Sequence, residues 1–239
     1  MNHGQGKILV LHPMIQGVEE KKDFFAGVQD VDVVGLSEGP DVIHNREDIA
    51  LAGFDTIRKV KDAEKAGYQA IVMSCHGDPN LYSVREAVRI PVVGIMELAM
   101  HFCAVLAHRF SILVPNLAIK RWQEENAIKY GFESKLASVR LVPFKVPLEE
   151  VLELSRRKPI PNEVIEPVVE ECIKAIEEDD AGAITFGCGC FRRLEGELRQ
   201  QLRGKGFEVP VVNPLPLAVD VARILIKHKL TQSLRCYPG

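Results

Sequence analysis

Two cysteines, each placed directly after an apolar run, are the residues best suited to chemistry. Cys75 follows residues 70–74, and Cys188 follows residues 181–187. An apolar run that stops at a cysteine, with glycine close behind, is typical of a buried strand that leads into a loop. We therefore expect one thiol at the end of a buried strand in each half of the chain.

A pair of opposed thiols suits the inversion of a stereocentre without a cofactor. One group removes a proton from carbon, and the other delivers a proton to the opposite face. The base must be a thiolate while its partner is a thiol, so the two pKa values must differ. A free cysteine has a pKa of about 8.5, which amides at a helix N-terminus lower. Each cysteine precedes an expected helix. The glycines between each cysteine and its helix let backbone N–H groups approach an oxyanion or carboxylate.

Further residues near the expected strand ends could contact a substrate. The candidate substrate-binding residues are His12, Pro13, His76, Gly77, Asp78, Asn116, Gly189 and Cys190. For His12 and His76, orientation of the substrate and a local backbone hydrogen bond both stay open. Asp78 is interpreted first as a helix cap, with tuning of Cys75 as the alternative. Asn116 either caps its helix or contacts the substrate.

Other interpretations of the cysteines are weaker. A lone cysteine at a strand end is more often a small buried side chain than a nucleophile, but a matched pair reverses that preference. The Cys188-Gly-Cys190 segment could hold a metal, yet no second closely spaced ligand pair completes a structural zinc site, and we predict none. Cys103 and Cys172 fall on expected helices and are interpreted as core residues, and Cys236 as an exposed tail residue.

Strands and helices alternate along the chain. The expected strands cover residues 7–12, 31–36, 70–75, 90–94, 111–115, 139–144, 181–187 and 209–213, and the expected helices cover 45–66, 82–88, 96–108, 116–130, 162–178, 193–202 and 215–228. Continuous apolar strands that alternate with helices predict parallel sheets covered on both faces.

The second half of the chain repeats the first. The matched pairs, at nearly constant separation, are Pro13 with Pro115, Ala66 with Ala181, Cys75 with Cys188, and Pro91 with Pro210. An ordered series of matches at this distance indicates a duplicated domain. We expect two similar flavodoxin-like α/β lobes related by a pseudo-two-fold axis.

The expected lobes are residues 1–108, with Cys75, and residues 109–214, with Cys188. A C-terminal helical segment, 215–239, could pack back on the first lobe. Ligands of open parallel sheets bind at the carboxyl ends of the strands, so the active site is expected in the cleft between the lobes.

Composition and charge argue against nucleic acid and a membrane as binding partners. The 239-residue chain has a net charge of −3 and no basic footprint, which argues against nucleic acid. No apolar run approaches the roughly 20 residues that span a bilayer. The polar segment 1–7 lacks the apolar core of a signal peptide. We expect a cytoplasmic homo-oligomer with free thiols, a small-molecule substrate and no membrane partner.

Three segments resemble the aspartate/glutamate racemase superfamily, and within it the hydantoin racemase branch. They are residues 75–81 (CHGDPNL), 91–100 (PVVGIMELAM) and 187–189 (GCG), and the resemblance extends over nearly the whole chain. It implies a cofactor-independent isomerase in which Cys75 and Cys188 serve as acid and base. Members of this superfamily racemise 5-substituted hydantoins, aspartate or glutamate, isomerise maleate, or decarboxylate arylmalonates.

The chain also departs from these relatives. Residues 12–14 read His-Pro-Met where hydantoin racemases carry an Asn-Pro-Asn-like segment, and residues 188–191 read Cys-Gly-Cys-Phe in place of Cys-Ala-Gly-Met. His76 and Gly189 replace the threonines of amino-acid racemases, which argues against aspartate or glutamate. We expect a racemase of a hydantoin-like or amino-acid-derived substrate. The alternatives are a maleate-type cis–trans isomerase, an arylmalonate-type decarboxylase, and a non-catalytic two-lobed small-molecule-binding protein.

Overall fold

The computed structural model describes residues 6–239. The first five residues, which contribute to the expectation of no signal peptide, lie outside the described residues. The chain divides into two compact units. Unit 1 contains the described residues up to Ile95 together with Leu215–Gly239, and unit 2 is Met96–Pro214.

Unit 1 is built from the two ends of the sequence. Its elements are β1 (Ile8–His12), α1 (Val18–Phe24), β2 (Val31–Gly35), α2 (Arg46–Lys65), β3 (Ala70–Met73), α3 (Leu81–Ala87), β4 (Val92–Gly94) and the C-terminal helix α9 (Pro214–His228).

Unit 2 is continuous in sequence. Its elements are α4 (Ile95–Leu106), β5 (Phe110–Val114), α5 (Leu117–Lys129), β6 (Leu136–Leu141), α6 (Leu148–Leu154), α7 (Asn162–Glu177), β7 (Ala183–Phe186), the 3-10 turn η1 (Gly189–Phe191), α8 (Glu195–Gly204) and β8 (Val211–Val212).

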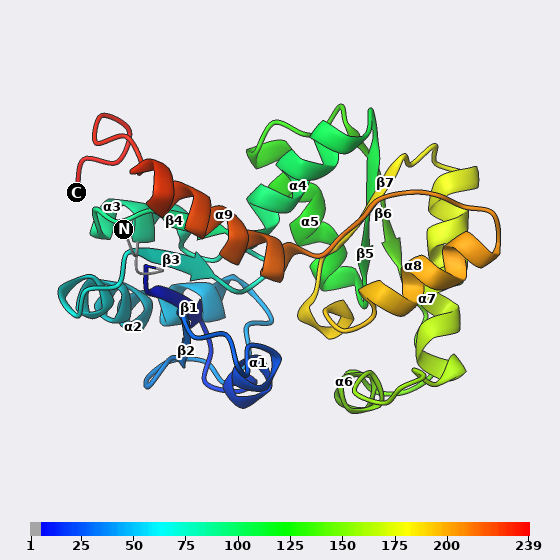
Figure 1. Cartoon of the computed structure of the whole chain (residues 1–239), viewed down its shortest axis with the longest axis horizontal. Helices are drawn as coiled ribbons and strands as arrows, with labels where there is room; N and C mark the ends of the chain where they lie inside the picture. Colours follow the sequence, from blue (N-terminus) through cyan, green and yellow to red (C-terminus); the bar gives the residue numbers. More distant parts are fainter. Residues whose placement is uncertain (1–5) are drawn as a thin grey trace. The chain divides into compact units, whose positions relative to one another are not determined.

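Each unit contains one parallel sheet, and the two sheets have the same strand order. Within the described residues the orders are β2-β1-β3-β4 and β6-β5-β7-β8 (Figure 1). The central strands β1, β3, β5 and β7 are buried along their whole length, whereas β2 and β6 are partly exposed. A strand covered on both faces needs an apolar side chain at every position, which explains the continuous apolar runs. The prediction of an α/β fold with two similar parallel sheets is confirmed.

The grouping of α4 differs from the division made on the sequence. The expected first lobe ended at residue 108, whereas the structure groups the chain from Met96 onward with unit 2. The His101 ring lies edge-on to Phe132 with 4.7 Å between ring centroids. A Cβ atom added to Gly182 would lie only 2.9 Å from the Ala107 side chain. Both contacts attach this segment to unit 2.

Three elements were not placed correctly from the sequence. The strand expected at residues 139–144 is β6, and it lies earlier, at Leu136–Leu141. The short helices α1 and α6 were not predicted. In α1, five of the seven residues are charged, so the segment has no apolar stripe.

Local sequence defines the ends of α2. The Asn45 side chain accepts a hydrogen bond from the Asp48 N–H at 3.0 Å, and the Asp48 carboxylate accepts one from the Asn45 N–H at 3.1 Å. This reciprocal capping box satisfies N–H groups that the first turn leaves without partners. Gly67, with φ of +87°, follows the last turn in the left-handed conformation that glycine adopts readily.

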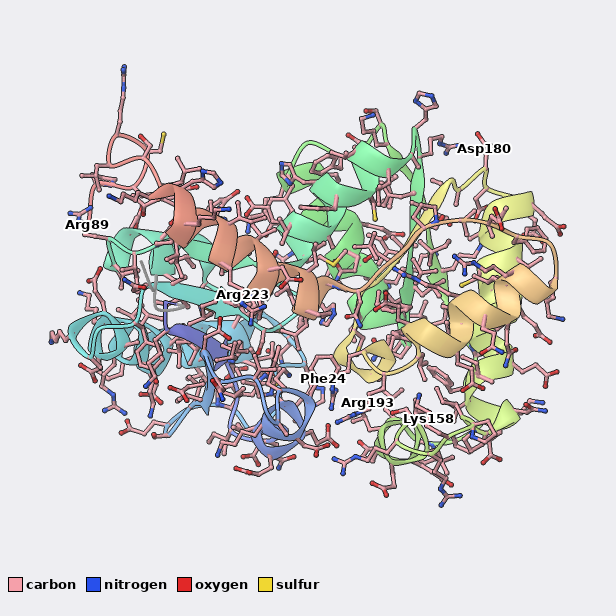
Figure 2. The ribbon with its side chains drawn as sticks, in the orientation of Figure 1. Phe24, Arg89, Lys158, Asp180, Arg193 and Arg223 are labelled. Carbon is pink, nitrogen blue, oxygen red and sulfur yellow. The ribbon has the colours of Figure 1, made fainter. Side chains whose placement is uncertain are left out.

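The C-terminal segment is attached to unit 1 by polar contacts. Arg223 of α9 donates two hydrogen bonds of 2.7 Å to the carboxylate of Asp30, which precedes β2 (Figure 2). Beyond α9, the Gln232 side chain accepts from the Val92 N–H at 2.9 Å and donates to the Val92 carbonyl at 3.0 Å. The last residues of the chain therefore complete the β4 edge of this sheet.

Unit 2 has a large apolar core on one side of its sheet. In Figure 1, α5 lies on one side of this sheet, and α7 and α8 lie on the other. Residues of α7, α8 and η1 form one buried cluster that includes Phe186 and Phe191. These two rings stack with 5.5 Å between centroids. Across residues 6–239, no helix combines the length and apolar character needed to cross a bilayer.

Candidate active site

The loop that carries Cys75 begins directly after β3 and turns tightly. Cys75 is half-buried, and its carbonyl accepts a hydrogen bond from the Asp78 N–H at 3.0 Å. Asp78 and Asn80 both adopt left-handed backbone conformations, with φ of +46° and +57°. Asp and Asn tolerate this region better than most residues, so the local sequence fits the turn.

The polar side chains of the Cys75 loop are buried. Asp78 is only 2% exposed. A Cβ atom added to Gly94, at the end of β4, would lie 3.1 Å from an Asp78 carboxylate oxygen and 2.5 Å from the Leu81 side chain. The absence of a side chain at Gly94 therefore leaves room for the Asp78 carboxylate. The N-cap of α3 is Asn80, which corrects the interpretation of Asp78 as that cap.

Two further residues lie at the same edge of the sheet. Parallel pairing of β1 with β3 matches Leu11 with Met73, so the chain leaves the sheet at His12 and Ser74 together. Ser74 is buried, and its hydroxyl has no hydrogen-bond partner in the part of the chain that the structure describes. His76, beside Cys75, is also buried.

His12 makes the local backbone hydrogen bond that was one of its two interpretations. Its Nε2 atom donates to the Gln16 carbonyl at 2.8 Å. The turn then continues through Gly17, whose φ is +81° and whose added Cβ would lie 3.3 Å from the same nitrogen. Pro13 is buried, and Met14 N–H bonds to the His12 carbonyl at 2.8 Å. His12 thereby stabilises the turn after β1.

The loop that carries Cys188 is shorter and contains a 3-10 turn. Cys188 is half-buried, extended in backbone conformation, and placed at the N-cap of η1. Its carbonyl accepts a hydrogen bond from the Phe191 N–H at 3.3 Å. Cys188 is thus adjacent to the N-terminal end of a helical turn, whereas α3 begins only at Leu81, well after Cys75.

Three buried side chains bind the backbone of the Cys188 loop. Gln123 Nε2 donates to the Gly187 carbonyl at 3.2 Å. Arg192 Nη1 donates to the Gly189 carbonyl at 2.7 Å. Asn213 Nδ2 donates to the Arg192 carbonyl at 2.9 Å, which leaves Asn213 Oδ1 with no partner within residues 6–239.

A second thiol follows Cys188 by two residues and is buried. Cys190 is 4% exposed and belongs to the apolar cluster of unit 2. Burial raises the pKa of the Cys190 thiol well above its ordinary value. The neighbouring Cys188 side chain adds to the increase in pKa, and the charge of Arg192 opposes it. Among the described residues, none of the six cysteines forms a disulfide.

Asn116 acts as a helix cap. It precedes α5, and its side-chain oxygen accepts a hydrogen bond from the Ile119 N–H at 2.9 Å. Of its two interpretations, capping is the one the structure shows. The side chain remains half-buried, at the carboxyl end of β5.

The structure brings the candidates together within each unit. In unit 1, residues 12–13 and 75–78 follow the adjacent strands β1 and β3. In unit 2, Asn116 and residues 188–190 follow the adjacent strands β5 and β7. Among the described residues, no group of three or more His, Cys, Asp or Glu side chains is suited to a metal ion.

Sequence reasoning missed four polar residues close to the two cysteines. They are Ser74, Gln123, Arg192 and Asn213. Of these four, Asn213 could have been found from the internal repeat. The spacing that matches Pro91 with Pro210 also matches Gly94 with Asn213. The repeat therefore marks a position where the two units differ in polarity, directly at a strand end.

Known proteins similar to this chain include racemases. A family model described as Asp/Glu/Hydantoin racemase matches residues 17–222. A hydantoin racemase of Pseudomonas sp. (strain NS671) is 31% identical over 97% of this chain and 90% of its own length. A hydantoin racemase of Paenarthrobacter aurescens is 32% identical over 82% of this chain and 78% of its own. The solved allantoin racemase from Klebsiella pneumoniae has a TM-score of 0.78 at 26% identity, over 95% of this chain and 90% of that one.

Proposed function

The chain belongs to the Asp/Glu/hydantoin racemase family, and from this premise we propose that it racemises a small cyclic amide of the hydantoin type, with Cys75 and Cys188 as acid and base. One sulfur, as thiolate, takes the proton from the stereocentre. The other, as thiol, gives a proton to the opposite face of the same carbon. The number of protons on the enzyme is unchanged, and the proposed reaction needs no cofactor.

One observation carries this proposal. The two half-buried thiols occupy equivalent places, two residues after the third strand in chain order of two sheets with the same strand order. Of the other cysteines, Cys103, Cys172 and Cys190 are buried and Cys236 is exposed. Burial alone raises the pKa of Cys103 to about 12, which removes it as a base near neutral pH.

The substrate class is supported by the relatives and by the loops. The relatives named hydantoin racemase and allantoin racemase point to a ring in which carbonyl and N–H groups flank the reacting carbon. Removing a proton beside a carbonyl creates an enolate-like oxyanion, which nearby N–H donors stabilise. We propose that backbone groups at Gly77 and Gly189 serve this role. His12, Pro13, His76, Asp78, Asn116 and Cys190 complete the proposed substrate-binding shell.

The test is racemisation of a 5-substituted hydantoin in D2O, with the enzyme-free rate subtracted. The wild type should interconvert the enantiomers and place deuterium at the stereocentre. Cys75→Ser and Cys188→Ser should each lose about 10³-fold in racemisation rate, since general acid–base groups contribute 10²- to 10⁴-fold. Cys236→Ser, which changes an exposed thiol, serves as the matched control and should retain the wild-type rate.

Other outcomes would redirect the assignment. Wild-type racemisation by either Cys75→Ser or Cys188→Ser would refute the two-base scheme. Turnover of maleate or of a substituted malonate, without turnover of hydantoin, would favour the cis–trans isomerase or the decarboxylase. Ligand binding that survives alkylation of both thiols, with no turnover, would favour a binding protein. A homo-oligomer is part of the same proposal, and sedimentation velocity checks it.

A further inference from the structure

Among the described residues, only one end of the buried Asn213 amide has a hydrogen-bond partner. Asn213 follows β8 directly and is 7% exposed. Its Nδ2 atom donates to the Arg192 carbonyl at 2.9 Å, and Oδ1 is the end without a partner. A carbonyl oxygen only accepts, so the atom that faces it must be the amide nitrogen. This contact therefore fixes which way the amide is turned and identifies the unpaired atom as an acceptor.

Capping of the following helix does not account for Oδ1. An asparagine directly before a helix commonly accepts a hydrogen bond from the N–H of the second or third helical residue. The first residue of α9 is Pro214 and the third is Pro216, and proline has no N–H. A buried acceptor without a donor is unfavourable, so this oxygen is suited to a donor that arrives with a ligand.

Asn213 is attached to the Cys188 loop. The adjacent parallel strands β7 and β8 pair Thr185 with Val212, so Asn213 leaves the sheet beside the residues that lead to Cys188. Adjacent strands lie about 5 Å apart. The bond to the Arg192 carbonyl then joins the Asn213 side chain to the turn that follows Cys188. We therefore expect a ligand held at Cys188 to lie beside Asn213.

The repeat has a side-chain oxygen at the corresponding point of unit 1. Gly94 matches Asn213, and a Cβ atom added to Gly94 would lie 3.1 Å from a carboxylate oxygen of Asp78. The oxygen comes from the loop after Cys75 in unit 1 and from the strand end itself in unit 2. Acceptor oxygens at both positions suit a ligand with N–H groups and disfavour a carboxylate, whose oxygens only accept.

We propose that Asn213 Oδ1 accepts a hydrogen bond from the substrate ring N–H beside the reacting carbon, which makes Asn213 a specificity-determining residue. The inference deepens the proposed function and rests on it. In a hydantoin the reacting carbon, C5, is flanked by N1–H and by the C4 carbonyl. Of these two groups only N1–H is a donor, and the second ring N–H, N3–H, is separated from C5 by C4. N1–H is therefore the partner assigned to Oδ1.

The experiment compares racemisation of 5-benzylhydantoin with that of its N1-methyl and N3-methyl derivatives. N1-methylation removes the proposed donor, so the wild type should lose about 100-fold in kcat/KM. Asn213→Leu keeps the size of the side chain without an acceptor. It should racemise the parent compound about 10-fold less efficiently, through a higher KM, and N1-methylation should then cost about 10-fold less than in the wild type. N3-methylation should cost the same factor in both proteins.

Two further variants test whether this change comes from the acceptor. Asn213→Asp keeps an acceptor oxygen, because its buried carboxyl group, when protonated, can donate to the Arg192 carbonyl in place of Nδ2. It should retain most of the N1-methyl penalty. Thr185→Val is the matched control, since it removes the 2.9 Å hydrogen bond to the Val212 carbonyl, next to Asn213, and leaves Oδ1 in place. It should show the wild-type penalty.

An N1-methyl penalty in Asn213→Leu equal to that of the wild type would overturn the proposal. If Asn213→Leu does not fold, Asn213→Ala also lacks the acceptor and makes the same comparison. A purely structural role of Asn213 would lower the free energy of unfolding and leave the ratio between the parent and N1-methyl substrates unchanged.

Binding of unsubstituted hydantoin separates this proposal from the proposed function. That ring has no stereocentre, so isothermal titration calorimetry can compare it with 1-methylhydantoin without turnover. If N1-methylation weakens binding to the wild type but not to Asn213→Leu, and the wild type racemises no hydantoin, the function is overturned and the Asn213 contact stands. Racemisation with the same N1-methyl penalty in both proteins would overturn the role of Asn213 alone. Absence of both binding and racemisation would overturn both.

Discussion

The Cys75 loop and the Cys188 loop follow equivalent strands and are stabilised by different means. The Cys75 loop depends on its own backbone, with left-handed Asp78 and Asn80, and on the space left by Gly94. The Cys188 loop is a compact 3-10 turn whose carbonyl groups are bound by side chains, one from the turn itself and two from elsewhere in unit 2. Those side chains are Gln123, Arg192 and Asn213.

This difference shows how a duplicated fold can give two identical side chains different properties. In the proposed two-base reaction one sulfur is a thiolate while the other is a thiol, and the two exchange these states with each turnover. Cys188 lies at the N-cap of a 3-10 turn, whereas the helix after Cys75 begins only at Leu81. In the repeat, the position of Cys190 is taken by Gly77 and that of Asn213 by Gly94.

The largest expected effect in this comparison comes from Gly94→Ala. The new methyl group would lie 2.5 Å from the Leu81 side chain and 3.1 Å from the Asp78 carboxylate, so the Cys75 loop must move. We expect the free energy of unfolding to fall by about 3 kcal/mol and racemisation to fall by about 100-fold. Urea titration and the racemase assay measure these two quantities.

Gly196→Ala is the control for that substitution. Gly196 lies in α8, and no atom is close enough to touch an added Cβ. Alanine in a helix should raise the free energy of unfolding by about 0.5–1 kcal/mol and leave racemisation unchanged. A Gly94→Ala variant as stable and active as this control would show that Asp78 does not require its present place.

An intermediate effect is expected from Arg223→Ala, which tests how unit 1 is completed. The substitution leaves the buried Asp30 carboxylate without its arginine, at a cost of about 2 kcal/mol near neutral pH. The hydrogen bond from Arg223 lowers the pKa of Asp30 below its ordinary value of 3.8. The stabilisation is therefore complete above pH 4 and is lost as the pH falls through the lowered pKa.

Denaturant titration at several pH values checks this expectation. The difference in unfolding free energy between the wild type and Arg223→Ala should be largest at pH 7 and should shrink below pH 4. Lys229→Ala, which changes a residue just beyond α9, provides the comparison on the same segment. A difference that stayed constant down to pH 2 would contradict the assigned role of the Asp30 carboxylate.

The smallest expected effect comes from Asn213→Ala. It removes the 2.9 Å hydrogen bond to the Arg192 carbonyl, and it also removes the Oδ1 acceptor that has no partner among the described residues. These two changes oppose each other, so the net loss should be about 1 kcal/mol. Thermal unfolding measures the loss, and an increase in KM would indicate that Oδ1 also accepts a hydrogen bond from the substrate.

Most of the fold could be predicted because it depends on burial. Strands covered on both faces must be apolar throughout, and the repeat then shows that the sheets match. The helices α1 and α6 were not found from apolar spacing. Each has seven residues, about two turns, which is too short to show a helical repeat clearly. The strand β6 is partly exposed, so its limits have no sharp apolar signal.

The sequence predicted the cysteines of the candidate site but not the polar residues around them. Cysteine is rare enough that its matched positions stand out in the repeat. Arginine, glutamine and asparagine are common on surfaces, and nothing local shows that Arg192, Gln123 and Asn213 are buried. The hydrogen bonds of Gln123 and Asn213 join segments that lie far apart in the chain. The sequence also offered two capping residues close together, Asp78 and Asn80, and the N-cap of α3 is Asn80.

The division of unit 1 has a consequence for biosynthesis. Unit 2 is one uninterrupted segment, Met96–Pro214, so all of its residues have been translated before α9 is complete. Domains generally fold as units while the chain is being made. Unit 2 can therefore fold first, whereas the Asp30 carboxylate gains its partner only after Arg223 has been synthesised. A message that stops before α9 would encode the whole Cys188 loop, but the sheet of unit 1 would lack its closing helix.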